Sequence, residues 1–272
     1  MTMRAVTLSQ TQRDAFAPAV EHAWCAAWGS LRYDTAIHVD DTAQHLRICT
    51  PRANDLLLNA VLRYRAPHPV TRRDIDAVIA PYRAAHIPFQ WWVRLGSEPL
   101  GLRNELAALG MQAWSTFPGM VLPLNEWQPT VTISQDIVVR PVTTVEEMTI
   151  ARNLICQVFS IQPEPMRHWC GNNPAFTVYL ATIGNAAVGA MTSQVDAGVA
   201  GFFHVATAQR WRNLGVAYAM MTEGLVHTRA QGAQIAALTA SPMAESLYHD
   251  LGFQDVCSYE FWMPSTRYME SL

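Results

Sequence analysis

Hydrophobic and polar positions along the chain follow two spacings, which predict helices and strands in mixed order. In the first half, a period near 3.6 predicts helices at 9–29, 70–86 and 98–109, and strand-like runs lie at 45–50, 56–65, 88–95 and 114–124. Thr71 is expected to cap the second helix, and Pro81 is expected to kink it.

A polar stretch ending at Asp136 precedes a second series of elements. Strands are predicted at 137–141, 176–195 (two strands joined through Gly184 and Asn185), 198–207, 234–240 and 257–263, with helices at 143–159, 217–231 and 243–251. Thr144 and Glu147 have the spacing of a capping box. The predicted organisation is therefore a domain at 1–125, a linker at 126–136 and a second domain at 137–272.

The two series end alike, with a helix, a Leu-Gly pair and a strand. Leu109-Gly110-Met111 corresponds to Leu251-Gly252-Phe253, an offset of 142 residues. Because a glycine often ends a helix before a strand, this match alone leaves open whether the halves are repeats.

Composition narrows the possible partners. Half of the residues are apolar, 15% are charged and the net charge is -3, so no basic face for nucleic acid is expected. No apolar run approaches the roughly 18 residues of a membrane span. The five cysteines lack a C-x-x-C pair and the nine histidines lack a metal-binding spacing, so neither disulfides nor a metal site are expected. With no signal peptide at its start, the chain is expected to be cytoplasmic.

The stretch ATAQRWRNLGVAYAMM, residues 206–221, joins a predicted strand to a predicted helix. The first amides of a helix have no partner within the helix and lie at its positive end, so they bind anions. Gly215 permits a tight turn there, Ala217 keeps the helix start accessible and Arg212 adds a cation. The pattern suits a phosphate, although an ordinary surface turn has the same residues.

The order of elements and two motifs, VATAQRWRNLGVA (205–217) and LYHDLGF (247–253), resemble the GNAT N-acetyltransferase superfamily across about residues 137–264. The resemblance implies an α/β fold of two tandem GNAT-like domains, each a mixed, mostly antiparallel sheet flanked by helices. It also implies an opening between the strands at 202–207 and 235–240 that holds acetyl-CoA.

The same resemblance assigns roles to residues. The cofactor-binding residues that it implies are Val205, Ala206 and Thr207 for the pantetheine arm, Arg212, Asn213, Leu214, Gly215, Val216 and Ala217 for the pyrophosphate, and Ser241. Tyr248 falls where the family often has a general acid, which would protonate the departing CoA thiolate. The sequence departs from the family at Asn213 and Ala217, where many members have glycine, and at Met243, where asparagine is frequent.

The first half lacks these features. At the offset of 142 residues, Arg212, Gly215 and Ala217 correspond to Val70, Arg73 and Ile75, and Tyr248 corresponds to Leu106. The first half is therefore expected to be a degenerate copy without a phosphate loop.

Acetyl transfer to nitrogen requires that the amine lose its proton. His204, on the strand before the loop, is the candidate base, and the alternative is a histidine packed on the sheet. The resemblance also implies that the connection 160–174 covers the acceptor, and the alternative is an ordinary proline-rich loop. The expected function is transfer of an acetyl group from acetyl-CoA to a small-molecule amine by direct attack on the thioester. The alternative is a non-catalytic CoA-binding sensor or scaffold, and a homodimer is left open.

Overall fold

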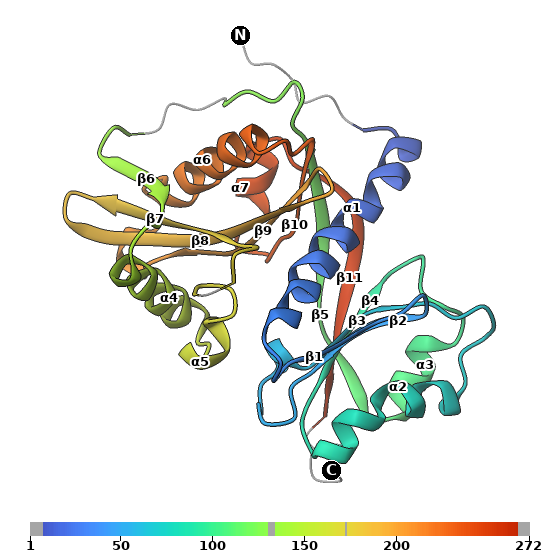
Figure 1. Ribbon diagram of the computed structural model, residues 1–272. Helices are drawn as coiled ribbons and strands as arrows, with labels where there is room; N and C mark the ends of the chain where they lie inside the picture. The colour runs from blue at the N-terminus through green and yellow to red at the C-terminus, as the bar shows by residue number, and fades with distance from the viewer. Residues whose placement is uncertain (1–7, 130–133, 172, 266–272) are drawn as a thin grey trace. The chain divides into compact units, whose positions relative to one another are not determined.

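The structure is a computed structural model that describes residues 8–129, 134–171 and 173–265 (Figure 1). The chain divides into two compact units, unit 1 (Met1–Ala23 and Gly119–Val256) and unit 2 (Trp24–Pro118 and Cys257–Leu272). The bounds of these units differ from the predicted domains at 1–125 and 137–272, because each unit combines two separate stretches of the chain. Helix α1 (Gln10–Gly29) and strands β5 (Met111–Pro123) and β11 (Gln254–Pro264) each continue from one unit into the other.

Unit 1 contains a mixed sheet in the order β5-β10-β9-β8-β7-β6. Its strands besides β5 are β6 (Ile137–Pro141), β7 (Thr177–Ile183), β8 (Ala186–Asp196), β9 (Val199–Thr207) and β10 (Ile235–Thr239). The recorded pairs are antiparallel except β9 with β10, which are parallel. The predicted hairpin through Gly184 is confirmed, because Ile183 pairs with Ala186.

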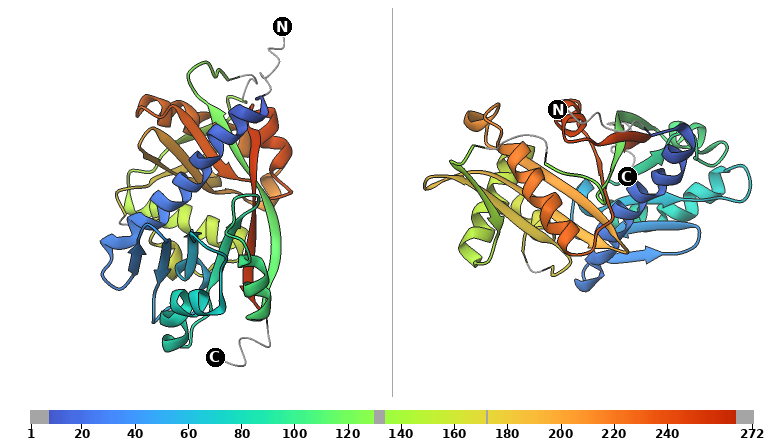
Figure 2. Two further views of the ribbon diagram at one scale, coloured as in Figure 1. Left: turned by 90° about the vertical axis from the view of Figure 1, so that its right-hand side faces the viewer. Right: turned by 90° about the horizontal axis from the view of Figure 1, so that it is seen from above.

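Helices cover both faces of this sheet. They are α4 (Val145–Phe159), α5 (Pro163–Met166), α6 (Val216–Ala230) and α7 (Glu245–Asp250), with a 3-10 turn η3 (Gln209–Trp211). Helix α6 packs on one face of β8 and β9, and α4 packs on the other (Figures 1 and 2). The predicted capping box of α4 forms in part: the Thr144 hydroxyl accepts from the Glu147 amide, while the Glu147 carboxylate accepts from Thr143 instead of Thr144.

Unit 2 contains a sheet in the order β1-β2-β3-β4-β11-β5. Its further elements are β1 (His38–Asp41), β2 (His45–Cys49), β3 (Ala60–Tyr64), β4 (Gln90–Arg94), α2 (Arg72–Ala85), α3 (Leu102–Ala108) and the 3-10 turns η1 (Ser30–Tyr33) and η2 (Leu56–Leu58). The strand expected from residue 56 begins only at Ala60, because the Asp55 carboxylate accepts from the Leu57 amide and stabilises the turn η2. Pro81 lies inside α2, which continues to Ala85.

The same strand, helix and parallel strand occur in both units. Unit 2 has β3, α2 and β4, and unit 1 has β9, α6 and β10. Gly110 after α3 and Gly252 after α7 both have positive φ angles, 95° and 98°, as expected for residues that end a helix in the left-handed region. The fold class is the predicted α/β arrangement of mixed sheets flanked by helices.

The strand that follows the last helix of each unit contributes to the sheet of the other unit. Strand β5 follows α3 of unit 2, yet its residues Gly119–Pro123 pair with β10 of unit 1. Strand β11 follows α7 of unit 1, and its residues Tyr259–Trp262 pair with β4 of unit 2. None of the helices in the described part of the chain is long and apolar enough to cross a membrane.

Helix α6 lies close to the sheet because Gly224 has no side chain. A Cβ at Gly224 would clash with Met191 Cε and lie 2.8 Å from the Phe202 ring, both in the core of unit 1. Gly29, in the last turn of α1, is also helical, but the nearest atom to a Cβ added at this position would be 3.7 Å away.

We expect Gly224→Ala to lower the free energy of unfolding by about 1–3 kcal/mol through overpacking, despite the higher helix propensity of alanine. Gly29→Ala, the control, should stay within about 0.5 kcal/mol of the parent protein. Urea unfolding of both variants measures the difference, and equal stabilities would contradict the close packing of α6.

Candidate acyl-CoA site

The candidate site lies where β9 and β10 stop pairing. Their parallel register runs from Val199↔Ile235 to Gly201↔Ala237. Strand β9 continues to Thr207 and β10 to Thr239, where β10 still pairs with Gly119 of β5. The backbone of β9 after Gly201 is therefore an edge that a ligand with amide groups can pair with.

A β-bulge interrupts β9 just beyond this point. Ala206 pairs with Ala190 and Phe203 with Thr192, so two residues of β9, His204 and Val205, face one residue of β8. His204 has a φ of 54°, in the left-handed region that costs a residue with a side chain about 1–2 kcal/mol. A bulge bends its strand and increases the local twist, which turns β9 at the place where pairing with β10 ends.

The His204 ring lies among aromatic side chains. Its centroid is 5.8 Å from that of Trp169, 6.4 Å from Phe159 and 6.4 Å from Phe203. Desolvation by these surroundings lowers the pKa of His204 to about 4, so the imidazole is neutral at pH 7.

The Thr192 hydroxyl contacts both the ring and the backbone of β9. It lies 3.2 Å from the Phe203 carbonyl oxygen and 3.2 Å from His204 Nδ1. Donation to the carbonyl oxygen leaves this hydroxyl to accept from Nδ1–H, and in that tautomer Nε2 carries the lone pair.

The loop after β9 presents the start of α6. Gly215 is the N-cap residue with a φ of 82°, Asn213 has a φ of 61°, and a Cβ at Gly215 would meet nothing within 4 Å. The first recorded helical bond joins the Ala219 amide to the Gly215 carbonyl. Helix geometry therefore leaves earlier amides, such as that of Ala217, for a ligand.

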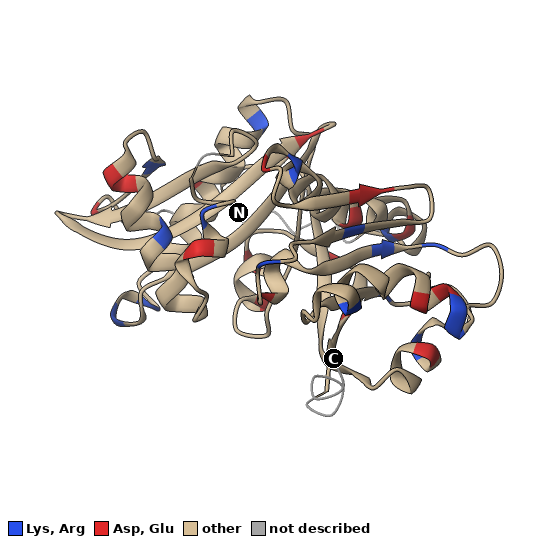
Figure 3. Ribbon diagram, turned by 60° about the horizontal axis from the view of Figure 1, so that its bottom comes forward, with Lys and Arg blue, Asp and Glu red and all other residues tan. Residues whose placement is uncertain are grey.

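The other predicted loop residues lie in the same region. Arg212, Asn213 and Leu214 are exposed, and Val216 is buried as the first residue of α6. Arg212 Nε lies 3.5 Å from the Thr207 carbonyl oxygen, and Arg210 stacks over Trp211, so two cations flank a loop without acidic residues. Acidic and basic residues elsewhere are interspersed (Figure 3).

The strand residues Ala206 and Thr207 pair with Ala190 and Gly189 of β8 through one edge, while Val205 lies in the bulge. Thr207 Oγ1 is buried and has no hydrogen-bond partner among the described residues. Ser241 is exposed after β10, and its carbonyl oxygen accepts from the amides of Ala244 and Glu245.

Tyr248 lies on α7 in the core of unit 1, 5% exposed, with its ring 5.7 Å from that of Phe253. Burial raises the pKa of Tyr248 well above the usual value of 10, so the phenol keeps its proton at neutral pH. This protonation state is the one that a general acid needs.

The connection expected to cover the acceptor is more buried than a surface lid. Met166 and Trp169 have no exposed surface and His168 is 4% exposed, whereas Arg167 is exposed and pairs with Glu164. Sequence reasoning missed Thr192 and Phe159, which meet His204 only through the fold.

The corresponding turn of unit 2 has recorded hydrogen bonds before and after the first residues of α2. The Val70 amide donates to the Leu100 carbonyl, and the amides of Thr71 and Ile75 donate to Asp74 and to the Thr71 carbonyl. Leu106, at the position equivalent to Tyr248, is fully buried. The turn before α2 has no glycine and Asp74 brings a negative charge to the first turn, whereas the loop before α6 contains Gly215 and no acidic residue.

Comparisons with known proteins find the same family that the sequence motifs resemble. Residues 143–263 match the family model of the acetyltransferase (GNAT) domain. A search of curated protein sequences gave no match. The GCN5-related N-acetyltransferase from Kribbella flavida has a similar fold, with a TM-score of 0.70, 16% identity and coverage of 90% of this chain and 95% of that chain.

Two further solved structures have the same fold over most of their length. The GCN5-related N-acetyltransferase from Sphaerobacter thermophilus is 14% identical with a TM-score of 0.58, covering 92% of each chain. A tandem GNAT protein from the clavulanic acid biosynthesis pathway is 15% identical with a TM-score of 0.56, covering 95% of this chain and 97% of that one. The family model identifies residues 143–263 as a GNAT acetyltransferase domain. Members of this family transfer acyl groups from acyl-CoA.

The depressed pKa of His204 makes stability depend on pH. The unfolded imidazole takes up a proton near pH 6.5, whereas the folded one does so near pH 4. The contribution of neutral His204 to the free energy of unfolding is therefore fully present above pH 6.5, and it is lost as the pH falls from 6.5 toward 4.

We expect His204→Gln to reduce the loss of unfolding free energy between pH 6.5 and 4, measured by urea unfolding at a series of pH values. His38→Gln removes an exposed imidazole as the control and should keep the parent slope. Parallel curves for the parent and His204→Gln would refute the neutral, desolvated state.

Proposed function

We propose that the chain transfers an acetyl group from acetyl-CoA to a small-molecule amine, with the chemistry in the domain at 137–272. The observation that carries this proposal is the succession of an unpaired edge of β9, its bulge and the glycine-capped start of α6. Each of these features offers backbone groups to a different part of a CoA thioester.

The cofactor is proposed to bind along these backbone groups. The pantetheine arm would pair with β9 near Val205–Thr207, because its amides match an extended strand. The pyrophosphate would accept hydrogen bonds from the loop Arg212–Ala217, which has the positive end of α6 and two exposed arginines nearby. Ser241 is proposed to contact the cofactor from beyond the end of β10.

The reaction is proposed to proceed by direct attack. The lone pair of the amine nitrogen forms a bond to the thioester carbonyl carbon, and the tetrahedral intermediate then breaks its carbon–sulfur bond. The Tyr248 hydroxyl would give its proton to the leaving sulfur, and the nitrogen would lose its proton to give the amide. The phenol of Tyr248 is protonated at neutral pH and can therefore supply this proton.

His204 is proposed to receive the amine. A residue with a pKa of about 4 holds a proton poorly at pH 7, so we assign it the acceptance of a hydrogen bond at Nε2 and assign final proton removal to water. The Nδ1 bond to Thr192 orients that lone pair. The aromatic rings around His204 favour an acceptor with an apolar portion.

The second candidate is a CoA-binding sensor or scaffold without catalysis. It requires the loop but does not require the Tyr248 hydroxyl. Release of free thiol from acetyl-CoA in the presence of a panel of amines separates the two functions, because only the enzyme produces amine-dependent thiol.

Gly215→Val is expected to weaken acetyl-CoA binding at least about tenfold, because the side chain would occupy the phosphate position and the loss of one charged hydrogen bond is worth about 1.5–3 kcal/mol. Gly198→Val is the matched control: Gly198 has a φ of 80° and open space around its Cβ, like Gly215. Both variants carry the same backbone strain, and calorimetry should find weakened binding only for Gly215→Val. Equal affinities would remove the loop from the cofactor site.

Tyr248→Phe is expected to lower kcat on the order of 100-fold with little change in acetyl-CoA affinity, the pattern of a group that acts in the transition state. Tyr179→Phe is the control, because Tyr179 is a buried tyrosine of the same core whose hydroxyl bonds Ser193. Steady-state rates and calorimetry of folded variants measure both effects. Full turnover in Tyr248→Phe, with chemistry rate-limiting, would make Tyr248 a packing residue.

A further inference from the structure

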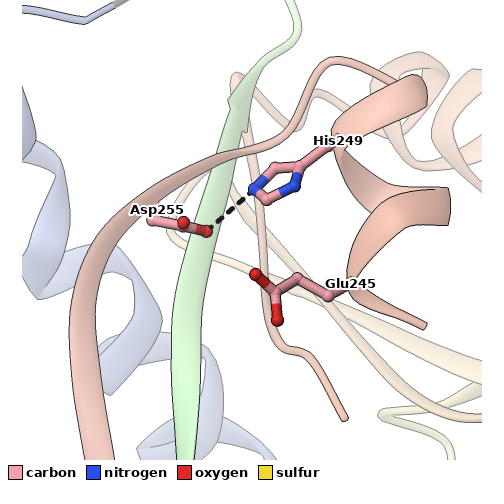
Figure 4. Close-up of side chains that lie close together, drawn as sticks. All are labelled: Glu245, His249 and Asp255. Atoms are coloured by element: carbon pink, nitrogen blue, oxygen red, sulfur yellow. Dashed lines mark hydrogen bonds and ion pairs between the residues drawn. The ribbon is translucent and has the colours of Figure 1, made fainter. Parts of the chain in front are cut away.

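Three side chains outside the proposed acyl-transfer site converge at the junction of α7 and β11. Glu245 and His249 are one helical turn apart on α7, and Asp255 is the second residue of β11 (Figure 4). His249 Nε2 lies 3.2 Å from Asp255 Oδ1, and one ligand atom of each residue lies within 4.8 Å of the other two. All three residues belong to unit 1.

The charges of this cluster are not balanced. Glu245 and Asp255 bring two carboxylates toward one imidazole, which supplies a single positive charge at most. Within residues 8–129, 134–171 and 173–265, the recorded ion pairs join Asp255 to His249 and give the Glu245 carboxylate no cation. Figure 4 shows the Glu245 carboxylate turned toward the other two side chains. A bound cation would compensate the excess negative charge.

We propose that Glu245, His249 and Asp255 bind a divalent transition metal ion of the zinc class. One imidazole nitrogen and two carboxylate oxygens suit borderline ions such as Zn²⁺ and Co²⁺, whereas Mg²⁺ and Ca²⁺ prefer oxygen ligands alone. The remaining coordination positions face solvent, since His249 and Asp255 are each 43% exposed, and water would fill them.

The geometry requires only a small adjustment. Metal–ligand distances near 2.0–2.2 Å place the ligand atoms of a tetrahedral site about 3.3 Å apart. His249 and Asp255 already have this separation, at 3.2 Å. The Glu245 carboxylate lies within 4.8 Å of the other two ligand atoms and its side chain has three rotatable bonds, so it has to approach by at most about 1.5 Å.

Such an ion would join α7 to β11 across the turn at Gly252. Tyr248 precedes His249 and faces the core, so the ion would be on the solvent side of the helix that carries Tyr248. The proposed role is stabilisation of α7, and it does not depend on the proposed acyl transfer. Sequence reasoning expected no metal site, because a Glu-x-x-x-His pair with an aspartate six residues later is not a recognised ligand spacing.

The test is a titration of the full chain, freed of metal by a chelator, with ZnCl₂ in a calorimeter. We expect one equivalent of Zn²⁺ to bind through this site, and we expect His249→Ala and Glu245→Gln each to weaken binding at least about tenfold. His22→Ala is the matched control, because His22 and Asp196 form a similar pair at 2.9 Å but belong to no recorded three-ligand cluster among the described residues. It should bind like the parent.

Thermal unfolding and Co²⁺ spectra supply independent readouts. Zn²⁺ should raise the Tm of the parent and of His22→Ala but not that of His249→Ala, because only a ligand of the native state stabilises it. The visible spectrum of the Co²⁺ form should lack thiolate charge-transfer bands. Absence of binding, a thiolate spectrum or unchanged binding by both His249→Ala and Glu245→Gln would overturn the proposal.

Discussion

Thr192 stabilises the bulge of β9, because its hydroxyl donates to the Phe203 carbonyl oxygen and also hydrogen-bonds His204 Nδ1. This local arrangement inserts one extra residue into a strand and keeps a histidine in the left-handed region. The bend that follows coincides with the end of the ladder to β10 and leads the chain into the loop at Gly215. The unpaired edge and the imidazole therefore lie at the bulge that these hydrogen bonds join to β8.

The two units differ less in their folds than in the first turn of one helix. Both have a strand, a helix and a parallel strand. In unit 2, the Asp74 carboxylate accepts from the Thr71 amide and brings a negative charge to the start of α2. In unit 1, Gly215 brings no side chain to α6. A carboxylate at a helix start already compensates the positive end of the helix, whereas a glycine at the N-cap leaves that compensation to a bound anion.

The sequence predicted the features that depend on neighbouring residues. Gly110 and Gly252 end their helices as expected, and the turn at Gly215 begins α6 within one residue of the predicted start. The bulge at His204 escaped prediction because it depends on Thr192, which is distant in sequence. The partners of β5 and β11 and the meeting of Glu245 with Asp255 also depend on the fold, and periodicity contains no information on which strands pair.

The pairing of β11 with β4 of unit 2 has a consequence for the order in which the protein folds during synthesis. Strands β1 to β4 of unit 2 leave the ribosome early, but β4 gains its partner β11 only after every strand of unit 1 has been synthesised. The early sheet therefore waits with an unpaired edge, which exposes backbone groups to other chains. Closing such a long stretch of chain adds entropic cost, so the part of the protein translated first reaches its final pairing last.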